Sequence, residues 1–100
     1  MLWPMRLPEK TTTFCLVLAC ELRRRREVAG LSMNELATSA GLSQPMIGFI
    51  EKGTCVPTAA SLFRIASVLG CPLSEIFGVV EKEIASNKKI APTGMHAKRR

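Results

Sequence analysis

The chain has 100 residues, 47% of them apolar, which suffices for one compact domain and excludes two independent cores. Tyr and Asp are absent and β-branched residues do not alternate with polar ones, so no strand is predicted and the composition favours an all-α fold. Of the formal charge of +6, residues 78–100 carry +4 and residues 21–77 only +1, so a solvated basic tail explains the charge as well as polyanion binding does.

The N-terminal region divides near residue 13. Residues 1–12 contain two prolines and no hydrophobic period, which predicts a flexible arm. Thr13 is placed to cap a helix over residues 14–29. The apolar run at 14–20 has a second interpretation, a lipoprotein signal ending at Cys20. It is short for a signal, continues directly into a charged helix, and is far too short to span a membrane.

This first helix has one continuous inward face that includes an arginine. A guanidinium at the edge of a core needs a carboxylate, because an unpaired buried charge is strongly destabilising. The candidate partner of Arg26 is Glu51. The three preceding arginines are interpreted as a solvated face, with a phosphate contact from one or two of them left open. The residues that share the inward face are Leu18, Leu22, Arg26 and Ala29.

Residues 32–53 carry two short helix patterns joined by a glycine turn. Ser32 and Glu35 have the spacing of a capping box, and Gly41 stands where a left-handed residue ends a helix. Ser43 is placed to cap the second helix, which has a proline in its first turn. The residues expected to face inward are Leu36, Ala37, Ala40, Ile47 and Ile50, and those expected to face outward are Gln44, Pro45, Gly48, Phe49 and Lys52.

Two further helices follow. One begins at the cap Thr58 and ends near residue 69 before a glycine, and the last begins at residue 73 or 74 and frays at 84–87. The folded domain is therefore predicted to span residues 13–84, followed by a flexible basic tail over 85–100. The residues at core spacing are Leu62, Ile65, Ala66, Leu69, Leu73, Ile76, Phe77 and Val80.

Residues that could carry catalysis or bind metal are scarce. Asp is absent, the one histidine is His96 in the polar tail, and no glycine-rich phosphate loop or Ser–base pair is present. We therefore expect no enzyme, no metal and no cofactor, and reduced thiols in a cytoplasmic protein. The cysteines, none in a C-x-x-C pair, are Cys15, Cys20, Cys55 and Cys71.

Residues 18–77 resemble the Cro and lambda-repressor-like (XRE) family of helix-turn-helix DNA-binding domains. The resemblance implies a compact five-helix bundle that binds double-stranded DNA as a homodimer and regulates transcription, with repression as the first expectation. It also implies an Arg–Glu pair like that expected between Arg26 and Glu51. The matching motifs are GLSxxELA at 30–37, AGLS at 40–43, IxxIEKG at 47–53, Pro57, and LxxIAxxLG at 62–70.

In such a domain, residues 44–52 form the recognition helix in the major groove. Gln44 is expected to read adenine, Pro45 or Phe49 to touch a thymine methyl, and Lys52 to contact phosphate. Many relatives carry Gln where this chain has Met33, and Phe49 has an alternative place folded back onto the core. The expected DNA-binding residues are Ser32, Met33, Ser43, Gln44, Pro45, Gly48, Phe49, Lys52 and Thr54.

Partners other than DNA are also expected. The family resemblance implies a dimer through the fifth helix, and the apolar excess at the start of the first helix could contribute. The alternative function is that of a protein-interaction module, such as an antitoxin-like protein that binds a partner through residues 14–20 or the tail, with DNA binding secondary. No membrane association is expected. The candidate dimer residues are Ile76, Phe77, Val79 and Val80, together with Cys15, Leu16 and Val17.

Overall fold

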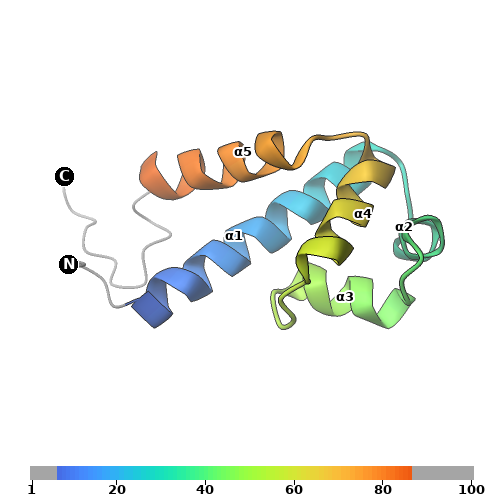
Figure 1. Ribbon diagram of the computed structural model, residues 1–100, viewed down its shortest axis with the longest axis horizontal. Coiled ribbons are helices and arrows are strands. Elements are labelled where there is room, and N and C mark those ends of the chain that lie inside the picture. Colours follow the sequence, from blue (N-terminus) through green and yellow to red (C-terminus); the bar gives the residue numbers. More distant parts are fainter. Residues whose placement is uncertain (1–6, 87–100) are drawn as a thin grey trace.

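The computed structural model describes residues 7–86, which form five α-helices and no strand (Figure 1). This confirms the expected all-α, five-helix fold. The predictions for residues 1–6 and 87–100 lie outside the described residues. The helices are α1 Leu7–Val28, α2 Met33–Ala40, α3 Gln44–Lys52, α4 Ala59–Leu69 and α5 Leu73–Ser86.

The first helix starts earlier than residue 14, where the sequence pattern places its first residue. α1 begins at Leu7, so residues 7–12 are helical rather than part of an arm, and Thr13 is a buried helical residue rather than a cap. Pro8 lies in the first turn, where its missing N–H costs nothing. Within this added stretch, the hydroxyl of Thr12 donates to the carbonyl of Pro8, four residues earlier, at 3.0 Å.

The later helices start where their caps predicted. The side chains of Ser32, Ser43 and Thr58 each accept a first-turn amide, from Glu35, Met46 and Ser61 respectively. The loops that end α2 and α3 both use a glycine in the left-handed conformation, at φ of 73° and 79°. These local signals define a tight turn between α2 and α3 and a sharp exit from α3.

The core joins all five helices. α5 lies along α1 in the antiparallel sense, while α2 packs between α3 and α4 at the opposite end of the molecule (Figure 1). Complete burial of a large aliphatic side chain such as Leu22 stabilises the fold by roughly 2 kcal/mol. The buried aliphatic residues are Val17, Leu18, Leu22, Leu36, Ala37, Ala40, Ile47, Ile50, Leu62, Ile65, Ala66, Ile76 and Val80.

The helices differ from membrane spans in length or apolar character. Within residues 7–86, no single helix is both long and apolar enough to cross a membrane. Only α4 and α5 taken as a pair meet the length and composition required, and that pair is bent by 101°.

Candidate nucleic-acid interface

The start of α2 is held by a complete capping box. The hydroxyl of Ser32 accepts from the backbone N–H of Glu35 at 3.0 Å, and the carboxylate of Glu35 accepts from the N–H of Ser32 at 2.8 Å. Within the described part of the chain, this leaves the amides of Met33 and Asn34 without an acceptor. They form a small set of donors at the positive end of the α2 dipole.

The start of α3 offers fewer donors. Ser43 Oγ accepts from the N–H of Met46 at 3.2 Å, and Pro45 has no N–H. The amide of Gln44 is thus the remaining donor of this first turn for which residues 7–86 provide no partner. A phosphate here would receive one backbone hydrogen bond rather than two.

The two faces of α3 are clearly separated. Ile47 and Ile50 are buried, whereas Gln44, Pro45 and Lys52 are exposed. Phe49 keeps 52% of its surface exposed, so the alternative in which its ring returns to the core is wrong. Aromatic rings are usually buried in monomeric domains, so this exposed ring is available to a partner.

One exposed residue of α3 was missed in the sequence. Met46 retains 37% of its surface, on the same side of the helix as Phe49, three residues further on. The spacing of Met46 and Phe49 could have predicted this exposure, because residues three apart on a helix are neighbours on its surface. Met46 therefore adds a flexible apolar side chain to the outer surface of α3.

Gly48 and Met33 lie close together across the two helices. A Cβ on Gly48 would lie 3.9 Å from the sulfur of Met33, and both residues are only partly exposed. Met33 therefore packs over the middle of α3, which the absence of a side chain at Gly48 permits. The thioether joins α2 to α3 by packing and offers no hydrogen-bond donor to a ligand.

The exit of α3 contains one free cation and one engaged hydroxyl. Lys52 is exposed, and no carboxylate of residues 7–86 forms an ion pair with it. The N–H and the hydroxyl of Thr54 both donate to the carbonyl of Phe49, at 3.1 and 3.2 Å. Thr54 could donate to phosphate only after its hydroxyl turned away from Phe49.

Arg26 and Glu51 form the predicted ion pair. Nε and Nη2 of Arg26 donate to the two carboxylate oxygens of Glu51 at 2.7 and 3.0 Å, while Nη1 donates to the carbonyl of Leu31 at 2.7 Å. The hydrogen bonds to Glu51 raise the pKa of Arg26 against the opposing effect of burial. The pair fixes α3 against α1 and also holds the loop that leads into α2.

The other arginines of α1 are paired with carboxylates. Arg23 pairs with Glu27 at 3.2 Å and Arg24 with Glu21 at 2.7 Å. Arg25 donates to Glu21 and, at 2.9 Å, to Glu75 on α5. Burial opposes ionisation of Glu21, but the hydrogen bonds from Arg24 and Arg25 outweigh it and lower its pKa. This basic run is therefore largely neutralised within the fold.

The surfaces expected to form a dimer are only partly exposed. Ile76 and Val80 are completely buried, because that side of α5 faces α1, so their assignment to an interface is wrong. Val17 is also a core residue. Phe77 and Val79 stay partly exposed, and Leu16 retains 48% of its surface beside the end of α3. The list of available apolar residues is shorter than the sequence indicated.

The remaining candidate groups are those that could bind a metal ion or form a disulfide. Among residues 7–86, no three His, Cys, Asp or Glu side chains come together as a metal site would require. All four cysteines are free thiols, and His96 lies outside these residues.

A capped α2, a glycine turn and an α3 fixed on one face and exposed on the other define a helix-turn-helix protein. The chain belongs to the helix-turn-helix family HTH_3, whose model matches residues 22–76. The match starts inside α1 and stops inside α5, so the first part of α1 and the last part of α5 lie beyond it.

Two curated relatives are similar to a little more than half of the chain. The HTH-type transcriptional regulator SutR of Escherichia coli is 39% identical over 57 residues, which cover 57% of this chain and 32% of the relative. An uncharacterized HTH-type transcriptional regulator of Haemophilus influenzae is 41% identical over 54 residues, covering 54% of this chain and 55% of the relative. The chain thus matches about a third and about half of their lengths.

Solved structures share the fold more widely. A crystal structure of an HTH_3 family transcriptional regulator from Vibrio cholerae superposes with a TM-score of 0.65 and 33% identity, covering 82% of this chain and 46% of the other. The clp gene regulator ClgR from Corynebacterium glutamicum has the same TM-score at 19% identity, with 87% and 96% covered. The second likeness concerns the fold alone.

Proposed function

We propose that this chain binds double-stranded DNA sequence-specifically as a regulator of transcription, with α3 in the major groove. The observation that carries the proposal is the division of α3. Its inner face is fixed by buried isoleucines and by the Glu51 ion pair, while its outer face is exposed from Gln44 to Lys52. A rigid helix with a free outer face suits the width of the major groove. Membership of the HTH_3 family supports the same function.

The exposed residues suggest distinct roles. Gln44 is the one outward side chain of α3 that can pair bidentately with adenine, which contributes about 1–3 kcal/mol of discrimination. Pro45 and Phe49 offer apolar contact to a thymine methyl. Lys52 and the unpartnered amides at the start of α2 would hold phosphates, with Thr54 joining only after its hydroxyl rotates.

We further propose that the protein acts in the cytoplasm as a homodimeric repressor. The exposed apolar residues nearest the family's expected interface are Phe77 and Val79 on α5, with Leu16 on α1 as an added contact. A two-fold dimer would present two copies of α3 to half-sites about one helical turn apart. Repression would follow from occupation of the operator by the dimer.

Selection from a random DNA pool tests the proposal. An inverted repeat with half-sites about one turn apart is expected. On the selected site, Gln44→Ala should reduce discrimination at one position per half-site, whereas the control Thr38→Ala, an exposed change on α2, should not. A pool that yields no shared sequence, or a Gln44→Ala variant with unchanged preference, would contradict the assignment.

A second function has specific support in two exposed aromatic rings. Phe49 on α3 and Phe63 on α4 retain 52% and 62% of their surfaces, which is unusual for a domain whose outer face meets only water and phosphate. A protein-interaction module, such as an antitoxin-like protein, would use such rings as anchors. In that case Phe63→Ser should abolish partner binding and leave DNA affinity unchanged.

A further inference from the structure

The outer surface of α3 carries few polar side chains. Phe49 and Met46 retain 52% and 37% of their surfaces, and Pro45 is also exposed. Pro45 lies four residues before Phe49 and Met46 three residues before it, so the ring has an apolar neighbour on either side. Gln44 is the one uncharged side chain on this outer surface that can form hydrogen bonds.

Met33 on α2 extends this apolar surface across the two helices. Its sulfur would lie 3.9 Å from a Cβ on Gly48, an ordinary van der Waals distance, so the thioether lies over the bare backbone of α3. Gly48 follows Pro45 by three residues and is its neighbour on the helix surface. Met33 and Gly48 are both half-buried. We call the surface formed by Met33, Pro45, Met46, Gly48 and Phe49 the apolar patch.

Groups that can hold an anion border the apolar patch at two places. Lys52, at the end of α3, is exposed and forms no ion pair with a carboxylate of residues 7–86. At the α2 edge, the backbone amides of Met33 and Asn34 have no acceptor within the same residues. An apolar surface bordered in this way matches a groove of duplex DNA, where base edges lie between two phosphate backbones.

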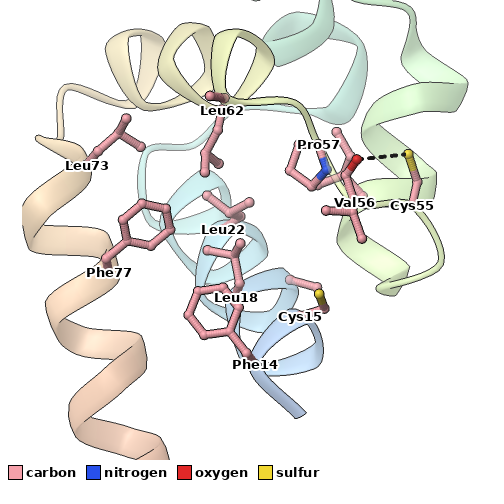
Figure 2. A pocket seen from close by; sticks show the side chains of 13 residues that line it. Phe14, Cys15, Leu18, Leu22, Cys55, Val56, Pro57, Leu62, Leu73 and Phe77 are labelled. Atoms are coloured by element: carbon pink, nitrogen blue, oxygen red, sulfur yellow. Dashed lines mark hydrogen bonds between the residues drawn. The ribbon is translucent and has the colours of Figure 1, made fainter. Parts of the chain in front are cut away.

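A second apolar site has no such border. An apolar cleft of about 280 Å³ opens between α1, α5 and the loop after α3, with Phe77 and Val56 in its walls (Figure 2). In the described part of the chain, no charged side chain is among its lining residues. Nothing around the cleft identifies what would cover it, whereas the apolar patch is bordered by groups that bind phosphate.

Pyrimidine bases differ in the major groove by one methyl group. Thymine and 5-methylcytosine present a methyl group at C5, where uracil and cytosine have a hydrogen atom. We propose that the apolar patch reads these C5-methyl groups, so that sequence preference depends mainly on methylated pyrimidines, with Gln44 adding one polar contact. Met33 and Gly48 are then specificity-determining residues. This inference rests on the proposed placement of α3 in the major groove.

The expected dependence on a methyl group is large enough to measure. An aromatic ring and a thioether gain free energy when they cover a methyl group, because both sides lose contact with water. Covering one group of this size changes a binding constant about fourfold. A reading surface made of hydrogen-bonding groups has no such dependence, because thymine and uracil present the same O4 acceptor.

Deoxyuridine substitution in an operator selected from a random DNA pool measures this dependence with the full chain. Replacing one thymine of a half-site by deoxyuridine should weaken binding about fourfold where the apolar patch covers it. The same replacement in flanking DNA outside both half-sites is the control and should leave affinity unchanged. Where a contacted T·A pair is changed to C·G, methylation of that cytosine at C5 should recover a similar factor. Fluorescence anisotropy measures each affinity.

Substitutions at Met33 test its part in the apolar patch. Met33→Gln has a similar length but ends in a polar amide, so the ratio of affinities for thymine and uracil duplexes should fall toward unity. Met33→Leu keeps an apolar side chain and should retain the ratio of the wild type. The ratio does not depend on phosphate contacts, which are the same in both duplexes. Circular dichroism checks that both variants fold.

Several results would overturn the proposal while leaving DNA binding intact. These are equal affinity for thymine and uracil duplexes at every half-site position, a selected half-site that lacks A·T pairs, and an unchanged ratio in Met33→Gln. If uracil duplexes bind equally and Phe49→Ser leaves DNA affinity unchanged, the apolar patch serves a protein partner instead. A pool that yields no shared sequence contradicts the regulatory function itself and this proposal with it.

Discussion

Arg26 on α1 donates hydrogen bonds to both carboxylate oxygens of Glu51 on α3, at 2.7 and 3.0 Å, and its remaining terminal nitrogen donates to the carbonyl of Leu31. One guanidinium thus connects the first helix, the outward-facing helix of the motif and the loop between α1 and α2. The two side chains are largely shielded from water, at 10% and 6% exposed. The orientation of α3 therefore depends on a paired charge as well as on its isoleucines.

Breaking this pair from one side should be costly. Glu51→Ala leaves the guanidinium of Arg26 buried without its carboxylate, and the free energy of unfolding should fall by about 3 kcal/mol. Urea denaturation measures the change. The double variant Arg26→Met, Glu51→Leu removes both charges and should recover much of the loss. If the double variant is as unstable as the single one, shape rather than charge pairing dominates at this site.

A second prediction concerns acid stability. The pKa of Glu21 is lowered below its ordinary value of 4.5, so its contribution to stability is present above pH 4.5 and is lost as the pH falls through the folded-state pKa. Glu21→Gln should lower the free energy of unfolding at neutral pH and flatten its decline below pH 4.5. Glu81→Gln, an exposed change on α5, is the control. Parallel acid profiles for Glu21→Gln and the wild type would refute the assignment.

The capping box makes a local prediction. Ser32→Ala removes the acceptor of the Glu35 amide and should destabilise the domain by about 1 kcal/mol. Ser39→Ala, in the same helix but exposed and away from its start, should be neutral or slightly stabilising because alanine is the better helix former. Thermal unfolding compares the two. Equal losses would mean that the cap contributes nothing specific.

The charge pairing in α1 predicts how DNA affinity should respond to salt. Lys52→Ala should weaken binding to all sequences and reduce the magnitude of the slope of log K against log salt by about 1 per bound subunit. Arg23→Ala should change that slope little, since Arg23 is already paired with Glu27. Fluorescence anisotropy at several salt concentrations decides this. A larger slope change for Arg23→Ala would place the phosphate contact on α1 instead.

Two neighbouring valines on α5 allow the effect of a substitution on association to be measured separately from its effect on folding. Val79 is partly exposed while its neighbour Val80 is completely buried. Val79→Lys should convert the proposed dimer to monomer with little loss of helix content, whereas Val80→Ala should cost roughly 1–3 kcal/mol of stability by leaving a cavity. Sedimentation and circular dichroism report the two effects. A Val79→Lys protein that still dimerises would exclude this side of α5 as the interface.

Much of the motif was predictable because its signals are local. A capping hydroxyl and the backbone N–H that donates to it are separated by three residues, as for Ser32 and Glu35, and the glycines that end α2 and α3 each lie one residue beyond the helix. The Arg26–Glu51 pair was also predictable, since a charge on an apolar face requires a partner. The start of α1 was not, because Thr12 and Thr13 match a cap as well as a helix interior, and only the hydrogen bond to Pro8 and the burial of Thr13 decide between them.

By itself, the sequence determined five helices, the caps of α2, α3 and α4, and the inward side of α3, since hydrophobic period and capping chemistry act within a few residues. Only the tertiary structure decided which apolar residues of α5 remain exposed. Apolar side chains occur on more than one side of this helix, at Ile76, Phe77, Val79 and Val80, and the side that packs against α1 is the one that is buried. The same packing brought Arg25 to Glu75, fifty residues away, and formed the apolar cleft beside Phe77. Contacts over such separations depend on how helices pack, which no local pattern specifies.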